Sequence, residues 1–205
     1  AALAAECAGF GFHLDFAPVL DVWSNPDNTV IGKRAFGSDW KVVSGFGAAV
    51  SNALQAAGVI PVVKHFPGHG DTVVDSHMGL PVVDKSLEDL SLQELPPFRD
   101  LISGGETPSG RAEAVPAVMV AHILMTQLDP DLPASLSPAV VTDLLRGELG
   151  FGGVVFTDDL TMGAITQNYG LGEAAVLAVE AGCDMLLVCH GRDSVDAARS
   201  ALLEA

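Results

Sequence analysis

The chain has little of the material from which disulfides or redox motifs are built. Its 205 residues include three cysteines, Cys7, Cys183 and Cys189, and none of them has C-x-x-C spacing. An odd number without a paired framework favours a reducing compartment. Cys183 and Cys189 lie in apolar surroundings, where a free cysteine usually packs as a small hydrophobic residue.

Positive charge is also scarce. The chain has 10 Lys and Arg residues against 26 Asp and Glu residues, which gives a formal net charge of −16. A protein of this sign repels phosphates and anionic lipid headgroups. We therefore expect no nucleic-acid partner and no attachment to an anionic membrane surface.

Long hydrophobic runs are missing as well, since none approaches the roughly 20 residues of a membrane-spanning helix. The sequence begins at AALAAECAG, without an initiator methionine and already in a helical pattern, and it ends in the helical pattern DSVDAARSALLEA. We therefore expect a domain cut at both ends. A cytoplasmic location is slightly favoured, and export or lipid anchoring stays open.

What the chain does contain is a regular alternation of strand-like and helical stretches. Five short, nearly continuous apolar runs end in polar residues, which is typical of strands buried on both faces of a parallel sheet. These runs span residues 12–20, 59–66, 117–123, 153–160 and 184–190. We expect one strand in each of them.

The helices expected between these strands have recognisable ends. An amphipathic helix over 40–57 stops at Gly58, and a later Ala-rich helix stops at Gly182, each glycine being a plausible C-terminal cap. Ser86 opens another helix with capping-box spacing. Ser137, directly before a proline, opens a third.

This alternation implies a parallel α/β fold, either a closed barrel or an open doubly wound sheet. The segments KHFPGHGD, AHI and TDDL place polar residues at the C-terminal ends of strands, which favours the barrel, because its active-site face lies there. A complete barrel has eight strands in about 250 residues. With a weaker strand near 133–136, we expect a single domain over 1–205, a TIM-type (β/α)8 barrel reduced to about its last six βα units.

The densest group of ionisable residues follows the second strand-like run. Residues 64–77, KHFPGHGDTVVDSH, hold one Lys, three His and two Asp. A hydrophobic core does not tolerate so many ionisable groups without partners, so we expect them to face a polar cleft. The spacing matches no zincin motif, and the chain has neither a G-x-G-x-x-G fingerprint nor a Walker motif. We therefore expect no metal and no cofactor.

These motifs resemble those of glycoside hydrolase family 3, in its β-N-acetylglucosaminidase (β-hexosaminidase) branch. The resemblance rests on KHFPGHGDT followed by DSH, together with GFHLDFAPVLDV, GKRAFGSD and VVFTDDLTMGAI in the same order, from about residue 9 to 190. It implies a retaining glycosidase. In such an enzyme a carboxylate attacks the anomeric carbon, and water then hydrolyses the glycosyl-enzyme.

The resemblance also implies which residues act on the sugar. Asp158, at the tip of a buried strand, matches the family nucleophile, and we expect Asp159 to cap the following helix. His77, supported by Asp75, matches the acid/base of this branch. A carboxylate beside an imidazole orients it and raises its pKa, which suits proton transfer near neutral pH.

Lys64, His65 and Arg34 match sugar-contacting residues of the family, although a structural ion pair is an alternative role for Lys64. We expect Asp21 to orient Arg34 or a loop. Three other polar residues have structural alternatives: His69 and Asp71 as loop stabilisers, and His122 as either a cleft residue or a satisfied core histidine.

The function implied is hydrolysis of terminal β-linked N-acetylglucosamine from peptidoglycan fragments or chitin oligosaccharides, by a monomer. The alternatives are a phosphorylase that uses phosphate in place of water, and a non-catalytic sugar-binding domain. The family also has a substrate-binding aspartate and a glutamate–arginine motif early in its sequence, which nothing here matches. We therefore expect the isolated chain to lack part of its sugar site.

Overall fold

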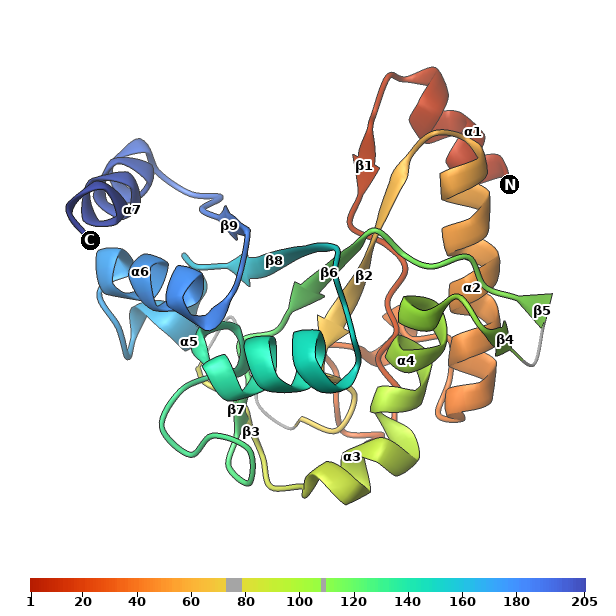
Figure 1. Ribbon diagram of the computed structural model, residues 1–205, viewed down its shortest axis with the longest axis horizontal. Helices are drawn as coiled ribbons and strands as arrows, with labels where there is room; N and C mark the ends of the chain where they lie inside the picture. Colours follow the sequence, from red (N-terminus) through yellow and green to blue (C-terminus); the bar gives the residue numbers. More distant parts are fainter. Residues whose placement is uncertain (73–78, 108–109) are drawn as a thin grey trace.

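The computed structural model describes residues 1–72, 79–107 and 110–205. Its main sheet has five parallel strands in the order β1-β2-β6-β8-β9. They are β1 (Leu14–Asp15), β2 (Ile60–Phe66), β6 (Ala117–Val120), β8 (Val154–Asp159) and β9 (Met185–Leu187). The strands form an arc with β1 and β9 at its ends and helices along its outer side (Figure 1). The predicted parallel α/β fold is confirmed, as a curled half-barrel.

The weak strand expected near 133–136 is wrong. Residues Ala134–Leu136 form the 3-10 helix η2. Both edges of β6 are already paired, with β2 and β8, so this segment crosses the end of β6 instead. There the amides of Ala134 and Ser135 donate to the carbonyls of Ile123 and Ala121. The main sheet in the described ranges therefore has five strands, not six.

Helices alternate with these strands along the chain. They are α1 (Ala2–Gly9), η1 (Gly32–Arg34), α2 (Trp40–Ala56), α3 (Leu87–Gln93), α4 (Leu95–Ser103), the π-helix η3 (Ala139–Glu148), α5 (Gly163–Thr166), α6 (Leu171–Ala181) and α7 (Arg192–Glu204). Two small sheets complete the description, β3 (Val82–Val83) with β7 (Leu124–Met125) and the hairpin β4 (Glu106–Thr107) with β5 (Gly110–Arg111). No helix within the described ranges is long and apolar enough to cross a bilayer.

The predicted helix ends are confirmed. Gly58, two residues after the end of α2, and Gly182, directly after α6, adopt positive φ angles of 76° and 108°, a conformation that glycine adopts without steric cost. Ser86 Oγ accepts the amide of Asp89 in a capping box. Ser137 Oγ accepts the amide of Val140 at the start of η3, which is wound as a π-helix.

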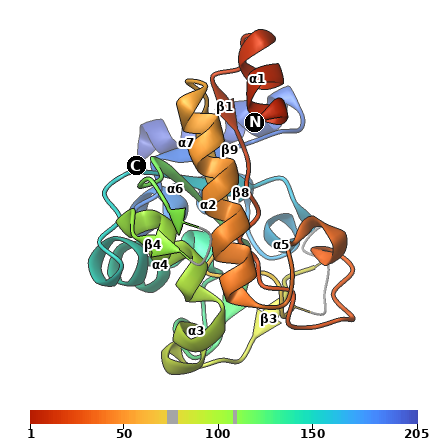
Figure 2. The same cartoon turned by 90° about the vertical axis from the view of Figure 1, so that its right-hand side faces the viewer.

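The two faces of the sheet are covered differently. On the outer face, Val63, Val118 and Val155 are fully buried in the main core. This core is made with helices such as α2 and α4, which lie side by side in Figure 2. The inner face carries a small cluster that includes Val62 and Phe156. At the C-terminal ends of the strands, polar side chains take over the inner face and form the site.

Candidate active site

A pocket of about 260 Å³ lies at the C-terminal ends of the parallel strands. It is lined by Phe16, Val30, Arg34, Lys64, His65, His69, Met119, Asp158, Asp159, Met162, Leu187 and Cys189. The structure thus brings together the predicted nucleophile, Asp158, and the predicted sugar ligands Lys64, His65 and Arg34. The predicted acid/base pair, Asp75 and His77, lies outside the described residues.

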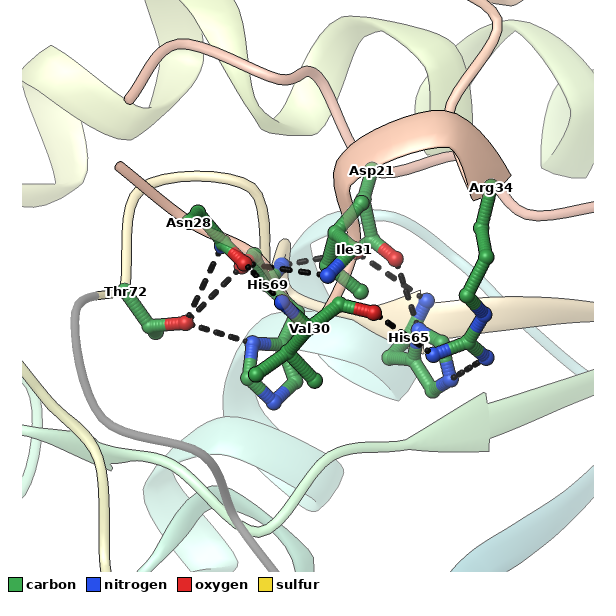
Figure 3. Close-up of polar contacts among 8 residues, drawn as sticks. All are labelled: Asp21, Asn28, Val30, Ile31, Arg34, His65, His69 and Thr72. Atoms are coloured by element: carbon green, nitrogen blue, oxygen red, sulfur yellow. Dashed lines mark hydrogen bonds and ion pairs between the residues drawn. The ribbon is translucent and has the colours of Figure 1, made fainter. Parts of the chain in front are cut away.

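His65 is held in place by the buried carboxylate of Asp21. Asp21, fully buried beyond β1, accepts a 2.6 Å hydrogen bond at Oδ2 from His65 Nδ1 and another of 2.6 Å at Oδ1 from the His69 amide (Figure 3). Burial alone would raise the pKa of Asp21, but the charge and the hydrogen bond of His65 hold it below its ordinary value. The peptide bonds Lys64–His65 and Phe66–Pro67 are both cis.

The same bond sets the tautomer of His65. Because a carboxylate only accepts, Nδ1 of His65 carries a proton whether the ring is charged or neutral, and in the neutral ring Nε2 is left as an acceptor. Arg34 Nη2 lies 3.3 Å from this Nε2, and a guanidinium only donates. Asp21 therefore orients Arg34 through His65, which agrees with the role expected for Asp21.

Arg34 belongs to a loop that is fastened to the turn after β2. The side chain of Asn28 forms an Asx turn, with Oδ1 accepting the amides of Val30 and Ile31. Its Nδ2 donates to the His69 carbonyl at 2.7 Å and to Thr72 Oγ1 at 3.2 Å (Figure 3). Sequence reasoning missed Asn28. The turn-rich stretch NPDNT was the only signal that could have revealed it.

Lys64 lines the pocket and has no anion close to its ammonium among the residues that the structure describes. Burial, and then the charge of Arg34, hold the pKa of Lys64 below its ordinary value. The carboxylates of Asp158, Asp15 and Asp21 act in the opposite direction. Among the described residues, no ion pair within 4.0 Å includes Lys64. This arrangement favours a role for the Lys64 ammonium as a hydrogen-bond donor to a bound ligand over the alternative of a structural ion pair.

The two neighbouring aspartates at the tip of β8 differ sharply. Asp159 is saturated, since Oδ1 accepts the amides of Thr161 and Cys189, and Oδ2 accepts Thr161 Oγ1 at 2.7 Å. Asp158 lines the pocket, and the only hydrogen bond to its side chain within the described ranges comes from the Asp159 amide, 2.9 Å from Oδ1. One oxygen of Asp158 is therefore open to the pocket. Asp159 holds the turn, as its expected capping role requires.

His122 is a core residue and is almost fully buried. Its Nε2 donates to the Asp159 carbonyl at 3.0 Å, and its Nδ1 lies 2.7 Å from Ser135 Oγ. Burial lowers the pKa of His122, so the ring stays neutral near pH 7. Of the two roles left open for His122, the structure supports the satisfied core histidine.

The apolar wall of the pocket was not predicted. Phe16, Met119 and Leu187 extend the inner-face cluster up to the polar residues. Strand alternation could have placed Met119 on this face, because it lies two residues after Ala117. In the described ranges, no group of three His, Cys, Asp or Glu side chains could hold a metal ion.

Residues 1–204 match the model of the glycosyl hydrolase family 3 N terminal domain. A β-hexosaminidase of Stenotrophomonas maltophilia is 40% identical over 188 residues, which are 92% of this chain and 52% of the relative. The chain therefore spans about half the length of the curated relatives that it matches.

Solved structures show the same fold. The family 3 β-N-acetylglucosaminidase from Paenibacillus sp. str. FPU-7 superposes with a TM-score of 0.93 at 48% identity, over 99% of this chain and 37% of that one. NagZ from Neisseria gonorrhoeae, in complex with N-trifluoroacetyl-D-glucosamine, gives a TM-score of 0.82 at 39% identity, over 97% and 53% of the two chains.

Proposed function

Because the chain belongs to glycosyl hydrolase family 3, as a member of its N-terminal domain family, we propose that its protein is a retaining β-N-acetylhexosaminidase. The substrate class is terminal β-linked N-acetylglucosamine in peptidoglycan fragments or chitin oligosaccharides. The observation that carries the proposal is the open carboxylate oxygen of Asp158, in one pocket with Lys64, His65 and Arg34. The ligand of the gonococcal relative, an N-acylglucosamine analogue, supports the sugar class.

In the first step an oxygen of Asp158 attacks the anomeric carbon while the bond to the leaving oxygen breaks. Protonated His77, oriented by Asp75, gives its proton to that oxygen. In the second step neutral His77 takes a proton from water. The water oxygen attacks the anomeric carbon and releases Asp158. Because a neutral imidazole adds no negative charge beside Asp158, it disturbs the anionic nucleophile less than a second carboxylate would.

The sugar is held by donors on rigid elements. Lys64 is near the end of β2, and Arg34 is oriented by His65, so both cations present hydrogen-bond donors to hydroxyl groups from fixed positions. Preorganised donors lose little entropy when the sugar binds. They distinguish this site from a loosely assembled surface patch.

We also propose that the barrel is completed, within the same domain, by parts of the protein outside this chain. Inner-face residues at the N-terminal ends of the strands are open to solvent: Ile60 is 43% exposed, Val154 41% and Met185 49%. Further βα units between β9 and β1 would cover these side chains. Their strands would also pair with the free edges of β1 and β9 and close the barrel.

The test uses the full-length protein and an aryl N-acetyl-β-glucosaminide. The wild type should release the phenol. Asp158→Ala should lose several orders of magnitude in rate and regain turnover with azide, which replaces the missing nucleophile and forms an α-glycosyl azide. Asp143→Ala removes an exposed carboxylate of η3 and serves as the matched control.

Two results would contradict the proposal. An inactive wild type would exclude the substrate class, and an active Asp158→Ala variant would exclude the nucleophile. Phosphate buffer adds a third arm, because a sugar 1-phosphate product would identify the phosphorylase in place of the hydrolase.

A further inference from the structure

A partly buried ion-pair cluster lies against the turn that follows β2, and the proposed mechanism does not use it. Lys85 Nζ lies 2.8 Å from Asp71 Oδ2 and 2.7 Å from Glu94 Oε1. Glu94, between α3 and α4, is 1% exposed, and its Oε2 has no hydrogen-bond partner among the described residues. A lysine shared by two carboxylates, one of them buried, is far from an ordinary surface ion pair.

Both carboxylates keep the lysine charged. Burial acts to lower the pKa of Lys85, but its hydrogen bonds to Asp71 and Glu94 raise that pKa above its ordinary value. For Glu94, burial raises the pKa even though Lys85 opposes the shift. Removing the ammonium would therefore leave the buried carboxyl group of Glu94 without the counter-charge that the described residues give it.

Through Asp71, the cluster is joined to the sugar-binding side of the pocket. Asp71 Oδ1 accepts Ser24 Oγ at 3.1 Å, and its carbonyl accepts Asn25 Nδ2 at 3.4 Å. Ser24 and Asn25 begin the loop that leads to Arg34. Asp71 also follows directly after the turn that bears His69.

Through Glu94, the cluster is joined to the core. A Cβ added to Gly68 would lie 2.8 Å from Cβ of Glu94, so the turn after β2 rests directly on this side chain. Leu90 and Leu95, on either side of Glu94, are fully buried. The Lys85 ammonium is therefore anchored to a part of the molecule that cannot shift without disturbing the core.

Asp71 and Lys85 also flank one particular stretch of sequence. Residues 72–84 begin directly after Asp71 and end directly before Lys85. This stretch contains Asp75 and His77, the acid/base pair of the proposed mechanism. The ion pair thus joins the two residues that flank this stretch in the sequence.

We infer that Lys85, bridging Asp71 and Glu94, is a positioning residue for the proton-transfer steps of the reaction. The inference rests on the proposed function, since it assigns the acid/base to the stretch that the bridge delimits. Proton transfer needs the donor within hydrogen-bond reach of the leaving oxygen, and a misplacement of about 1 Å can cost on the order of 100-fold in rate. Loss of the bridge should therefore slow those steps selectively.

The test compares two substrates in the full-length protein. A 2,4-dinitrophenyl N-acetyl-β-glucosaminide has a leaving group that departs without a proton, whereas an alkyl N-acetyl-β-glucosaminide needs the acid. We expect Lys85→Met to lower kcat/KM about 10- to 100-fold for the alkyl substrate and less than about threefold for the dinitrophenyl substrate. Lys85→Arg should retain most of the alkyl activity. Lys41→Met, which removes an exposed lysine of α2, is the matched control for loss of charge.

An equal loss on both substrates would overturn the inference, because a merely structural defect does not distinguish leaving groups. If Lys85→Met does not fold, Asp71→Asn carries the test, since it keeps an acceptor for Ser24 but removes the charge that faces Lys85. Failure of the proposed function has a separate sign: the wild type would then not hydrolyse the dinitrophenyl substrate, or Asp158→Ala would hydrolyse it normally.

Discussion

The two walls of the pocket, one on the β2 side and one on the β8 side, differ in how many hydrogen bonds hold their polar side chains. On the β2 side, His65 is hydrogen-bonded at both ring nitrogens, and Asp21 accepts hydrogen bonds from His65 of β2 and from His69 in the turn that follows. On the β8 side, Asp158 receives one hydrogen bond from within the described ranges, at a single oxygen. Groups that bind a sugar gain from being fixed, whereas a carboxylate loses nucleophilicity with each hydrogen bond that stabilises its charge. The contrast agrees with the roles proposed for the two sides, a binding wall that contains His65 and a reacting wall that contains Asp158.

The largest expected effect tests the reacting wall. Asp158→Asn should lower kcat/KM in the full-length protein by a factor on the order of 10⁴, since an amide cannot form the glycosyl ester. Its thermal unfolding midpoint should stay within about 1 °C of the wild type, because a side chain with one hydrogen bond contributes little to the fold. A variant that is both inactive and clearly destabilised would place Asp158 in the fixed wall and break the comparison.

The binding wall should respond in the opposite way, through Asp21. Asp21→Asn keeps an acceptor for the His69 amide but removes the charge that faces His65. We expect the free energy of unfolding, from urea titration, to fall by about 3 kcal/mol, as for other buried pairs that lose one partner. The amide also disfavours the tautomer of His65 that accepts from Arg34, so kcat/KM should fall about 10- to 100-fold.

Asp143→Asn, at an exposed site on η3, is the matched control for Asp21. It should change neither the free energy of unfolding nor the rate. If Asp21→Asn were as stable as this control, the buried carboxylate would not hold the turn after β2, and the binding wall would have to be held by other contacts.

Acid should erase the stabilising contribution of Asp21. In the unfolded chain its carboxyl group titrates near 3.8; in the folded protein burial would raise the pKa, but the charge and hydrogen bond of His65 lower it overall. A depressed folded pKa means that the contribution is complete above the unfolded value and is lost as pH falls through the folded one. The gap in unfolding free energy between wild type and Asp21→Asn should therefore be constant from pH 7 to about pH 5 and shrink at lower pH. A gap that widens in acid would assign the stabilisation to another group.

The sequence predicted the parts of these walls that depend on strand periodicity. Lys64 and Asp158 follow buried apolar runs, and the C-terminal ends of parallel strands share one edge, so their meeting in one pocket follows from the fold class. The network of Asp21, Asn28 and His65 depends on how two loops fold over each other, which local pattern does not encode. The roles of Asp75 and His77 stay predictions.

The misjudged element has a different explanation. The stretch 133–136 reads Pro-Ala-Ser-Leu, and strands are depleted in proline and alanine, so its composition gave little support to a strand. Both edges of β6 are paired, with β2 and β8, and this segment forms the 3-10 helix η2. Asp158 and Asp159 are the same residue type, so sequence alone does not separate them. They differ because the amides of Thr161 and Cys189 donate hydrogen bonds to the carboxylate of Asp159, whereas that of Asp158 accepts one from the Asp159 amide.

The smallest expected effect concerns Cys189, which lines the reacting wall beside the two aspartates. Cys189 is exposed, but partial desolvation, and then the neighbouring charge of Asp159, raise the pKa of its thiol, so little of it is the reactive thiolate near pH 7. The contact that matters to the turn is made by its backbone amide, which donates to Asp159 Oδ1 and does not depend on the side chain. Cys189→Ser should therefore keep kcat/KM within about twofold of the wild type, and the wild-type thiol should react with iodoacetamide no faster than a free cysteine does. A large loss of activity, or fast alkylation that the sugar product blocks, would mean that the thiol itself contacts the substrate. The reacting wall would then contain a second functional group besides Asp158.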